Sequence, residues 1–218
     1  MSIVVQRYRY SVYARIVAAV LQAKGIIWRA EEHDPFSQAG DDGLRHPFGR
    51  VPVLIHDGFV LYETRAICTY LDAAFGGPEL HRSAPAALGR MQQVIGIADA
   101  YGYWPMVRQV FAHRVFRTAL GESADEAVVA QGIRDAAPVL TALEPVAAEG
   151  LVLTRQGLDL ADLHLAPMMA AFVQAPEGAS ALAACPALAG WWQWMRDQAC
   201  MIETDPGLPG LGEATGAG

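Results

Sequence analysis

The segment HPFGRVPVLIHDGFVLYETRAICTYLDAAF, residues 46–75, contains two short apolar runs followed by a pattern with helical spacing. The runs VPVLI and FVLY flank Asp57 and Gly58, a pair that favours the tight turn of an antiparallel hairpin. After the hairpin, apolar residues recur three and four positions apart, at Ile67, Tyr70, Leu71, Ala74 and Phe75. The segment therefore predicts a β-hairpin that leads directly into an amphipathic helix.

The residues before this segment predict a strand, a helix and a second strand. SIVVQRY (2–8) and IIWRAEE (26–32) have the composition of strands. Between them a helical stripe is formed by Tyr13, Ile16, Val17, Val20 and Leu21. Gly25 follows at the place of a left-handed C-terminal cap. We expect a small α/β unit in the order strand, helix, strand, loop, hairpin, helix, with a right-handed crossover between parallel strands.

The second half of the chain lacks strand patterns and is rich in Ala and Leu. Helical periodicity predicts helices near 85–117, 123–148, 159–174 and 187–200. We therefore expect an α/β domain over 1–77 and an all-α helical domain over 85–205. The remaining segment, 206–218, contains PGLPGLGEATGAG and predicts a flexible tail.

The composition excludes several classes of function. The 218 residues include 53% hydrophobic and 18% charged residues, as in ordinary globular proteins. The formal net charge is −7 and Lys24 is the only lysine, which argues against a nucleic-acid partner. No apolar run approaches the ~18 residues that span a bilayer, and arginines interrupt the N-terminus before a signal-like core. We expect a cytoplasmic protein, with Cys68, Cys185 and Cys200 buried and holding neither metal nor disulfide.

Three separated motifs resemble those of the cytosolic glutathione transferases. The 46–75 segment is similar to the family's N-P-x-G-[KQ]-V-P-x-L, hairpin and E-S-x-A-I-x-x-Y-L. Ser11 and Gly25 have the separation of the catalytic serine and the helix-ending glycine in serine-type, bacterial-like members. GLDLADLHLAPMM, residues 157–169, resembles the capping motif of the family's C-terminal helical core. The resemblance implies a thioredoxin-like βαβ-ββα domain followed by an all-α domain, with glutathione as co-substrate and a homodimeric assembly.

The resemblance also implies which residues hold glutathione. Pro52 would follow a cis peptide bond, leaving the backbone of Val51 to pair with the cysteinyl part of the ligand. The alternative is a proline at the start of an edge strand. Arg50 would bind the glycyl carboxylate, although it can equally be a solvated charge, with Arg45 and His46 just before it. His46 replaces the family's usual Asn.

Glu63 and Thr64 occupy the family's Glu-Ser positions. The free N–H groups of a helix that begins here, with the hydroxyl of Thr64, suit the γ-glutamyl carboxylate. The side chain of Glu63 suits the adjacent ammonium group. The alternative is that Thr64 only caps the helix, and the two interpretations are compatible.

Ser11 is the candidate catalytic residue, because its hydroxyl can donate a hydrogen bond to the glutathione thiolate. Tyr10 is the rival donor, since tyrosine-type members use a phenol. Two observations leave the assignment open: Ser11 also suits a plain N-cap, and Val12 replaces the proline that usually follows the serine. A cysteine here would favour disulfide exchange, which serine cannot perform.

The second substrate would lie against the first long helix, whose stretch DAYGYWPMVRQVF spans 99–111. We expect a kink at Pro105 and a pocket for an apolar electrophile. The predicted pocket residues are Tyr13, Tyr103, Trp104 and Val107. The alternative is that these aromatic side chains belong to the core, and Tyr13 also falls on the apolar stripe of its helix.

The acidic residues of the helical half receive structural roles. Asp159 and Asp162 have capping-box spacing, so both are excluded from the active site. Asp99 is a candidate for the γ-glutamyl ammonium across a dimer, with a solvated acid as the alternative. His164 and the tryptophans at 191, 192 and 194 lack charged neighbours in the sequence and are predicted to serve packing.

The expected function is attack of a glutathione thiolate on an electrophilic, largely apolar second substrate, without a metal. Two alternatives stay open. One is a non-catalytic glutathione-binding, ligand-binding or regulatory protein of the same fold. The other is a glutathione-dependent isomerase of the maleylacetoacetate type.

Overall fold

The computed structural model describes residues 2–36 and 43–210. It divides into an N-terminal unit, Met1–His81 with Ala199–Pro206, and a helical unit, Arg82–Gln198 with Gly207–Gly218. The expected helical domain over 85–205 therefore differs at its end, where α9 (Ala199–Ile202) belongs to the N-terminal unit. The reason is a direct contact, because the guanidinium of Arg15 donates to the carbonyl of Met201 at 2.9 Å. Of the predicted tail, residues 211–218 lie outside the described part.

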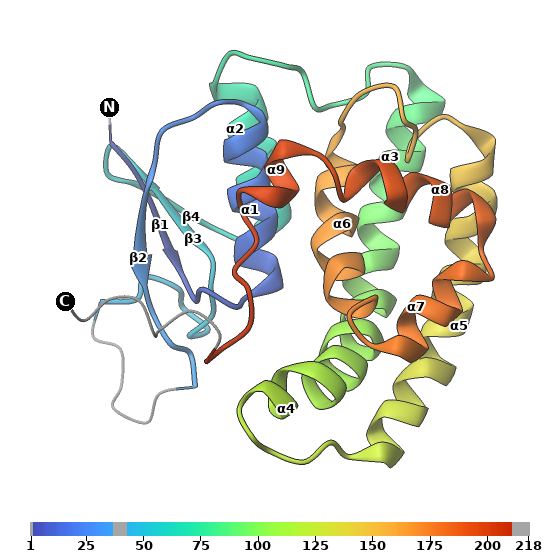
Figure 1. Ribbon diagram of the computed structural model, residues 1–218. Helices are drawn as coiled ribbons and strands as arrows, with labels where there is room; N and C mark the ends of the chain where they lie inside the picture. The colour runs from blue at the N-terminus through green and yellow to red at the C-terminus, as the bar shows by residue number, and fades with distance from the viewer. Residues whose placement is uncertain (1, 37–42, 211–218) are drawn as a thin grey trace. The chain divides into compact units, whose positions relative to one another are not determined.

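The N-terminal unit contains one four-stranded sheet in the order β2-β1-β3-β4 (Figure 1). The strands are β1 (Ile3–Arg7), β2 (Arg29–Glu32), β3 (Val53–His56) and β4 (Phe59–Tyr62). β1 and β2 are parallel, whereas β3 is antiparallel to both β1 and β4. The predicted hairpin is confirmed, and its turn residues Asp57 and Gly58 have positive φ angles of 47° and 91°.

The two predicted helices of this unit are α1 (Val12–Ala23) and α2 (Thr64–Ala74). Four of the five predicted stripe residues of α1 are fully buried, and Tyr13 is half-buried. Gly25 has φ 65° and ends the helix as predicted, with the N–H of Ile26 donating to the carbonyl of Leu21 at 2.9 Å. Because Ile26 completes this cap, β2 starts only at Arg29, later than the sequence predicts.

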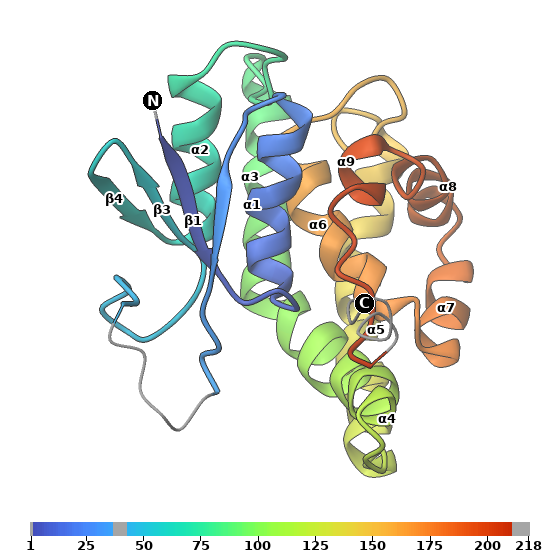
Figure 2. The ribbon, with the colours of Figure 1, turned by 60° about the vertical axis from the view of Figure 1, so that its left-hand side comes forward.

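The strand directions place the starts of both helices at one edge of the sheet, namely the edge at which β1 and β4 end and β3 begins. β1 and β4 are each antiparallel to β3, so they run in the same direction and end at the edge where β3 begins. α1 follows β1 and α2 follows β4, so both helices start there. Figure 2 shows the two helices on the same side of the sheet. Ser11, Pro52 and Glu63 therefore lie at the same edge.

At the opposite ends of α1 and α2, a buried ion pair joins the two helices. Lys24 Nζ lies 2.9 Å from Asp72 Oδ1, with side chains 1% and 7% exposed. The ammonium also donates to the carbonyl of Pro78, and Asp72 accepts from the backbone N–H groups of Leu80 and His81. Burial alone would raise the pKa of Asp72, but the hydrogen bonds from Lys24, His81 and Leu80 hold it below its ordinary value.

The helical unit confirms the helices predicted near 85–117, 123–148 and 159–174 and adds one at 176–183. The helix predicted over 187–200 ends at Met195, because a turn at 196–198 separates it from α9. In order, the unit contains α3 (Pro85–Ile97), η1 (Ala98–Gly102), η2 (Trp104–Phe116), α4 (Arg117–Ala119), α5 (Glu126–Glu149), α6 (Leu160–Phe172), α7 (Pro176–Ala183) and α8 (Pro186–Met195). The predicted 85–117 helix is continuous, but η1 and η2 are π-helical. Prolines and π-helical turns both bend helices, and Figure 2 shows the ribbon changing direction below α3.

The sequence did not predict α7 because this short helix has little apolar periodicity. Only Gly178 and Leu182 of its eight residues are buried. Gly178 lies against α6, where an added Cβ would be 2.1 Å from the carbonyl oxygen of Phe172. This close approach, rather than an apolar stripe, fits α7 into the unit.

The predicted capping box at the start of α6 is present and buried. Asp159 Oδ1 accepts from the N–H of Asp162 at 3.1 Å, and Asp162 Oδ2 accepts from the N–H of Asp159 at 2.8 Å. Trp191 is buried, as its predicted packing role requires, and its Nε1–H also donates to Asp162 Oδ1 at 2.8 Å, which the sequence did not indicate. The signal was missed because these partners are distant in sequence. Burial and the charge of Asp159 raise the pKa of Asp162 well above its ordinary value.

Two further observations concern the expectations from composition. Within residues 2–36 and 43–210, no helix combines the length and apolarity that crossing a membrane requires. Within the described residues none of the three cysteines forms a disulfide, and Cys68 and Cys200 are buried as predicted. Cys185 is only half-buried, and burial raises the pKa of its thiol.

Replacing Lys24 with Met should strongly destabilise the N-terminal unit. The variant leaves the Asp72 carboxylate buried without its cation, which costs about 3–5 kcal/mol of unfolding free energy at pH 7. The difference in unfolding free energy between the variant and the wild type should narrow below pH ~4. The lowered pKa of Asp72 stabilises the wild type only while the carboxyl is ionised, so this stability is lost as the pH falls through that pKa. Urea unfolding measures both effects. Arg29→Met, which removes an exposed ion pair, is the control, and an equal loss there would contradict the prediction.

Replacing Trp191 with Phe should destabilise the helical unit by about 1–3 kcal/mol, because Asp162 loses a buried donor. Trp192→Phe is the matched control, since this neighbouring indole is half-buried and a loss under about 1 kcal/mol is expected. Thermal or urea unfolding of both variants gives the comparison. Equal effects would show that the indole hydrogen bond adds nothing to packing.

Candidate functional site

Ser11 caps the N-terminus of α1, as the sequence predicts. Its backbone is extended, with φ −72° and ψ 120°, and its Oγ accepts from the N–H of Ala14 at 3.2 Å. The backbone N–H of Ser11 donates to the carbonyl of Tyr8 at 2.9 Å, which closes the turn before the helix. Because Oγ acts as an acceptor in the cap, its own proton can still be donated to a ligand. Val12, which takes the place of the family's proline, is buried.

Two tyrosines precede Ser11 in the turn between β1 and α1. The rings of Tyr8 and Tyr10 meet edge to face at 5.6 Å, and Tyr8 also contacts Phe36 at 5.8 Å. Burial and the charge of Asp34 raise the pKa of Tyr8. Tyr10 is half-buried and directly precedes Ser11, the predicted donor.

A buried glutamine holds the loop that leads to the predicted binding residues. Gln6 is 2% exposed, and its Nε2 donates to the carbonyl of Gly43 at 2.8 Å. Its Oε1 accepts from the N–H of Arg45 at 2.9 Å. The sequence analysis missed this residue, although a polar side chain within the apolar run IVVQR was a signal. Gln6 thus fixes the chain just before His46.

His46 lies buried at the centre of this loop. Its side chain is 4% exposed, and its ring contacts those of Tyr62 at 4.9 Å and Phe48 at 5.9 Å. The N–H of Phe48 donates to His46 Nδ1 at 3.1 Å, and the N–H of Gly49 donates to the carbonyl of His46 at 3.0 Å. Burial lowers the pKa of His46, with the charge of Arg50 acting in the same direction and Glu63 opposing it.

The peptide bond between Val51 and Pro52 is cis, which confirms the prediction. The ladders of β3 begin at Val53, so Val51 lies just outside the paired part of the sheet. β3 is an inner strand between β1 and β4, which excludes the alternative of a proline at the start of an edge strand. Val51 is half-buried, and the adjacent Arg50 is exposed.

The start of α2 differs from the predicted serine-like cap. The N-cap is Glu63, with φ 71° and ψ 112°, and no side chain caps the helix. Thr64 is the first helical residue and is buried, so the interpretation of Thr64 as the cap was wrong. A positive φ at a residue other than glycine is strained, and such strain is common at ligand-binding positions. The side chain of Glu63 is 67% exposed, and its Oε1 lies 3.9 Å from His46 Nε2.

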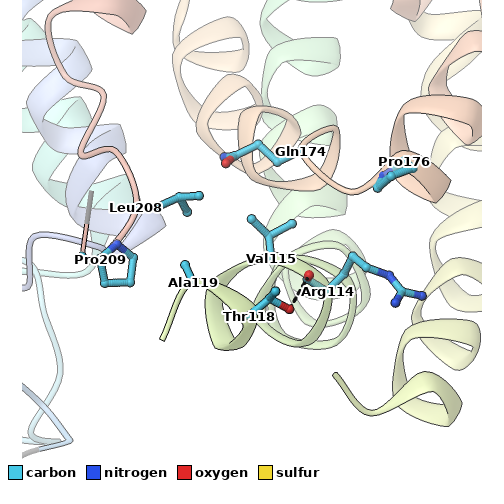
Figure 3. Close-up of a pocket in the computed structure, with 9 residues that line it drawn as sticks. Arg114, Val115, Thr118, Ala119, Gln174, Pro176, Leu208 and Pro209 are labelled. Carbon is cyan, nitrogen blue, oxygen red and sulfur yellow. Dashed lines mark hydrogen bonds between the residues drawn. The ribbon is translucent and has the colours of Figure 1, made fainter. Parts of the chain in front are cut away.

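The predicted second-substrate residues are distributed over both units. Tyr13 lies on α1 of the N-terminal unit and is half-buried. In the helical unit, Val107 is buried, Trp104 is 63% exposed and Tyr103 is half-buried. None of the four lines the pocket drawn in Figure 3, which has a volume of about 470 Å³. That pocket is lined by Arg114, Val115, Thr118, Ala119, Gln174, Pro176, Leu208, Pro209 and Gly210.

Asp99 and His164 form a pair within the helical unit. His164 is 2% exposed on its side chain, and its Nε2 lies 2.8 Å from Asp99 Oδ1. His164 is buried, as its predicted packing role requires, and its charged partner is one that the neighbouring sequence does not show. Asp99, for which a γ-glutamyl contact and a solvated acid were the alternatives, keeps a side chain that is 35% exposed and also pairs with His164. The partners are 65 positions apart in the chain, so no local pattern indicated them. Among the residues that the structure describes, no cluster of three His, Cys, Asp or Glu side chains suits a metal ion.

Sequence comparisons identify relatives of the chain. Residues 6–79 match a family profile described as "Glutathione S-transferase, N-terminal domain". Glutathione S-transferase 1 of Zea mays is 30% identical over 156 residues, covering 71% of this chain and 72% of that protein. Glutathione S-transferase 3 of Zea mays is 26% identical over 196 residues, 88% of each. A stringent starvation protein A homolog of Histophilus somni is 23% identical over 161 residues, covering 74% of this chain and 70% of that protein.

Solved structures agree with this architecture. Glutathione S-transferase III in its apo form aligns with a TM-score of 0.81 and 25% identity, covering 94% of this chain and 95% of that chain. Glutathione S-transferase I bound with lactoylglutathione aligns with a TM-score of 0.79 and 22% identity, covering 94% and 98%, which shows the shared fold. The thioredoxin-like unit with its mixed sheet and the helical unit are those expected from the sequence motifs. The chain belongs to the glutathione S-transferase family.

Proposed function

We propose that this chain binds glutathione at the edge of the sheet and activates its thiolate for attack on an electrophilic, largely apolar second substrate. The observation that carries the proposal is the Ser11 hydroxyl, which caps α1 and keeps its proton available for donation. It lies at the same sheet edge as the cis-proline loop and the start of α2, which lacks a side-chain cap. Three parts of one ligand can thus be bound at one edge.

Each end of glutathione has a chemically suited group at this edge. The backbone of Val51 lies outside the β3 ladder and suits pairing with the cysteinyl part. The start of α2 and the Thr64 hydroxyl suit the γ-glutamyl carboxylate, and the exposed Glu63 carboxylate suits the ammonium. Arg50, exposed on the loop before Val51, is the proposed cation for the glycyl carboxylate.

The energy needed to activate the thiol is within reach of one hydroxyl. A thiol of pKa ~8.5 is mostly protonated at pH 7, and lowering that pKa by about two units requires about 2.7 kcal/mol. A hydrogen bond to a charged group supplies about 1.5–3 kcal/mol, and a helix N-terminus adds about 0.3–1 kcal/mol. The serine-type mechanism with Ser11 as donor therefore needs no general base, and Tyr10 remains the rival donor.

The other expectations from the sequence belong to the same proposal. Tyr13, Tyr103, Trp104 and Val107 are the proposed contacts of the second substrate. A homodimer, a cytoplasmic location and a mechanism without metal follow from the family resemblance. A glutathione-dependent isomerase of the maleylacetoacetate type would use the same activated thiolate.

A non-catalytic binding or regulatory role is the second candidate. The matches to proteins named stringent starvation protein A homolog favour it, because that name describes no transferase activity. The two candidates differ in the state of bound glutathione. A transferase holds it as a thiolate at neutral pH, whereas a carrier needs only to bind it.

Replacing Ser11 with Gly should abolish the ultraviolet absorbance of the glutathione thiolate in the complex at pH 7. The variant removes the donor, so the thiol returns toward its ordinary pKa of ~8.5 and the thiolate fraction at pH 7 falls about 25-fold, from about three quarters to about 3%, for a shift of two pKa units. Difference spectra of the complex measure this fraction directly. Tyr10→Phe is the matched control and should keep the signal.

Three other results would change the assignment. Loss of the thiolate signal in Tyr10→Phe, with Ser11→Gly unchanged, would make Tyr10 the donor. Binding of glutathione without any thiolate signal in the wild type would favour the carrier. No binding at all would overturn the proposal.

The capping role of Ser11 can be separated from its proposed chemical role. Ser11→Ala should lower the unfolding free energy by about 1 kcal/mol, whereas Ser11→Gly should cost only a few tenths, because glycine is tolerated at N-cap positions. Urea unfolding of both variants checks this difference. Equal losses in the two variants would contradict the assignment of Oγ as the cap of α1.

A further inference from the structure

The turn formed by residues 46–49 carries the buried His46 next to the proposed glutathione contacts. The imidazole Nδ1 accepts the N–H of Phe48 at 3.1 Å, so Nδ1 is unprotonated and the ring proton lies on Nε2. Nε2 points to Glu63, whose Oε1 is 3.9 Å away. The neutral ring therefore holds the turn before the cis-proline through one hydrogen bond and lies near the start of α2, with Glu63 beyond hydrogen-bond distance.

We propose that His46 is a positioning residue whose protonation weakens the binding of glutathione. In the neutral ring, Nδ1 holds the turn that precedes Arg50 and Val51. In the imidazolium, Nδ1 carries a proton and faces the N–H of Phe48, so two donors oppose each other and the turn loses this bond. The inference rests on the proposed glutathione site and adds a pH-dependent control of it.

Protonation also acts on the second side of the site. The imidazolium at Nε2 attracts the carboxylate of Glu63, which is proposed to receive the ammonium of the ligand. The ligand then competes with His46 for the same carboxylate. Both consequences, an opened turn and an engaged Glu63, weaken binding, so they cannot cancel.

The surroundings of the ring set the direction of the pH effect. The charged groups that face His46 are Glu63 at the start of α2 and Arg50 on its own loop, and Tyr62 of β4 packs against the ring. Burial is the largest influence and lowers the pKa of His46 below its ordinary value. His46 is therefore neutral at pH 7, and it becomes protonated only at a pH below the ordinary pKa of a histidine. The affinity for glutathione should therefore decrease as the pH falls.

The experiment uses S-methylglutathione, because this ligand has no thiol whose ionisation would itself change with pH. Titration calorimetry between pH 7.5 and 5 gives its dissociation constant for the full-length wild type. The constant should rise as the pH falls through the lowered pKa of His46, by at most tenfold for each further pH unit. Binding near pH 5.5 should release protons, measured from the heats in two buffers with different ionisation enthalpies.

His46→Asn is the decisive variant. The Asn side-chain oxygen can accept the N–H of Phe48, as in an Asx turn, but it does not titrate in this range. Its dissociation constant should vary by less than about twofold between pH 7.5 and 5, with no proton release, because no titrating acceptor remains. His56→Asn, at the other end of β3, is the matched control and should keep the wild-type pH dependence.

Each remaining outcome decides the matter. A wild-type affinity that is constant with pH, or a decline that persists in His46→Asn, would overturn the role of His46 while leaving the glutathione site intact. Absence of binding to both glutathione and S-methylglutathione at pH 7.5 would instead refute the proposed function. If His46→Asn fails to fold, proton release by the wild type still tests the inference, since a purely structural histidine would release none.

Discussion

The buried ion pair between Lys24 and Asp72 is the constraint on which the N-terminal unit depends. It joins the end of α1 to the last turn of α2 and binds the segment that follows α2 through Pro78, Leu80 and His81. A lysine with 1% of its side chain exposed persists only with a partner, and the chain has no other lysine. With their ends fixed, the two helices can lie side by side only with both N-termini at the other edge of the sheet.

That geometry explains why the residues of the proposed site lie at one edge of the sheet. β1 and β4 end where β3 begins, so the turn before α1, the cis-proline loop and the turn before α2 meet without any long excursion of the chain. Gln6 of β1 holds this loop by accepting a hydrogen bond from the N–H of Arg45. His46, on the same loop, places its Nε2 3.9 Å from Oε1 of Glu63. The site is thus built from three short connections whose positions the sheet register determines.

Local patterns predicted the features that depend on neighbours in the chain. The stripe of α1, its start at Ser11, its end at Gly25 and the turn at Asp57 each follow from spacing or residue type within a few positions. The contacts of Gln6 with Gly43, of Asp99 with His164 and of Asp162 with Trp191 join residues 29 to 65 positions apart. Such pairs are set by tertiary packing, so the sequence indicated at most that a polar residue stood in an apolar run.

Most helices begin with a side-chain cap or a proline in the first turn, and α2 begins with neither. In the described part of the chain, side chains cap three of the helices of at least eight residues: Ser11 caps α1, Asp125 caps α5 and Asp159 caps α6. Four other described helices of this length have a proline in the first turn: α3, η2, α7 and α8.

A proline there removes one N–H group that would need a partner. α2 has neither device, and its N-cap Glu63 is held at a strained positive φ. The first N–H groups of α2 thus have neither a capping side chain nor a proline in the first turn, and the Glu63 carboxylate lies beside them. A ligand with a negative group next to a positive one could bind both, with its negative group on the N–H groups and its positive group on the carboxylate. Ser11 differs because one hydroxyl can cap α1 and still donate its proton, so capping does not compete with the proposed contact to a thiolate.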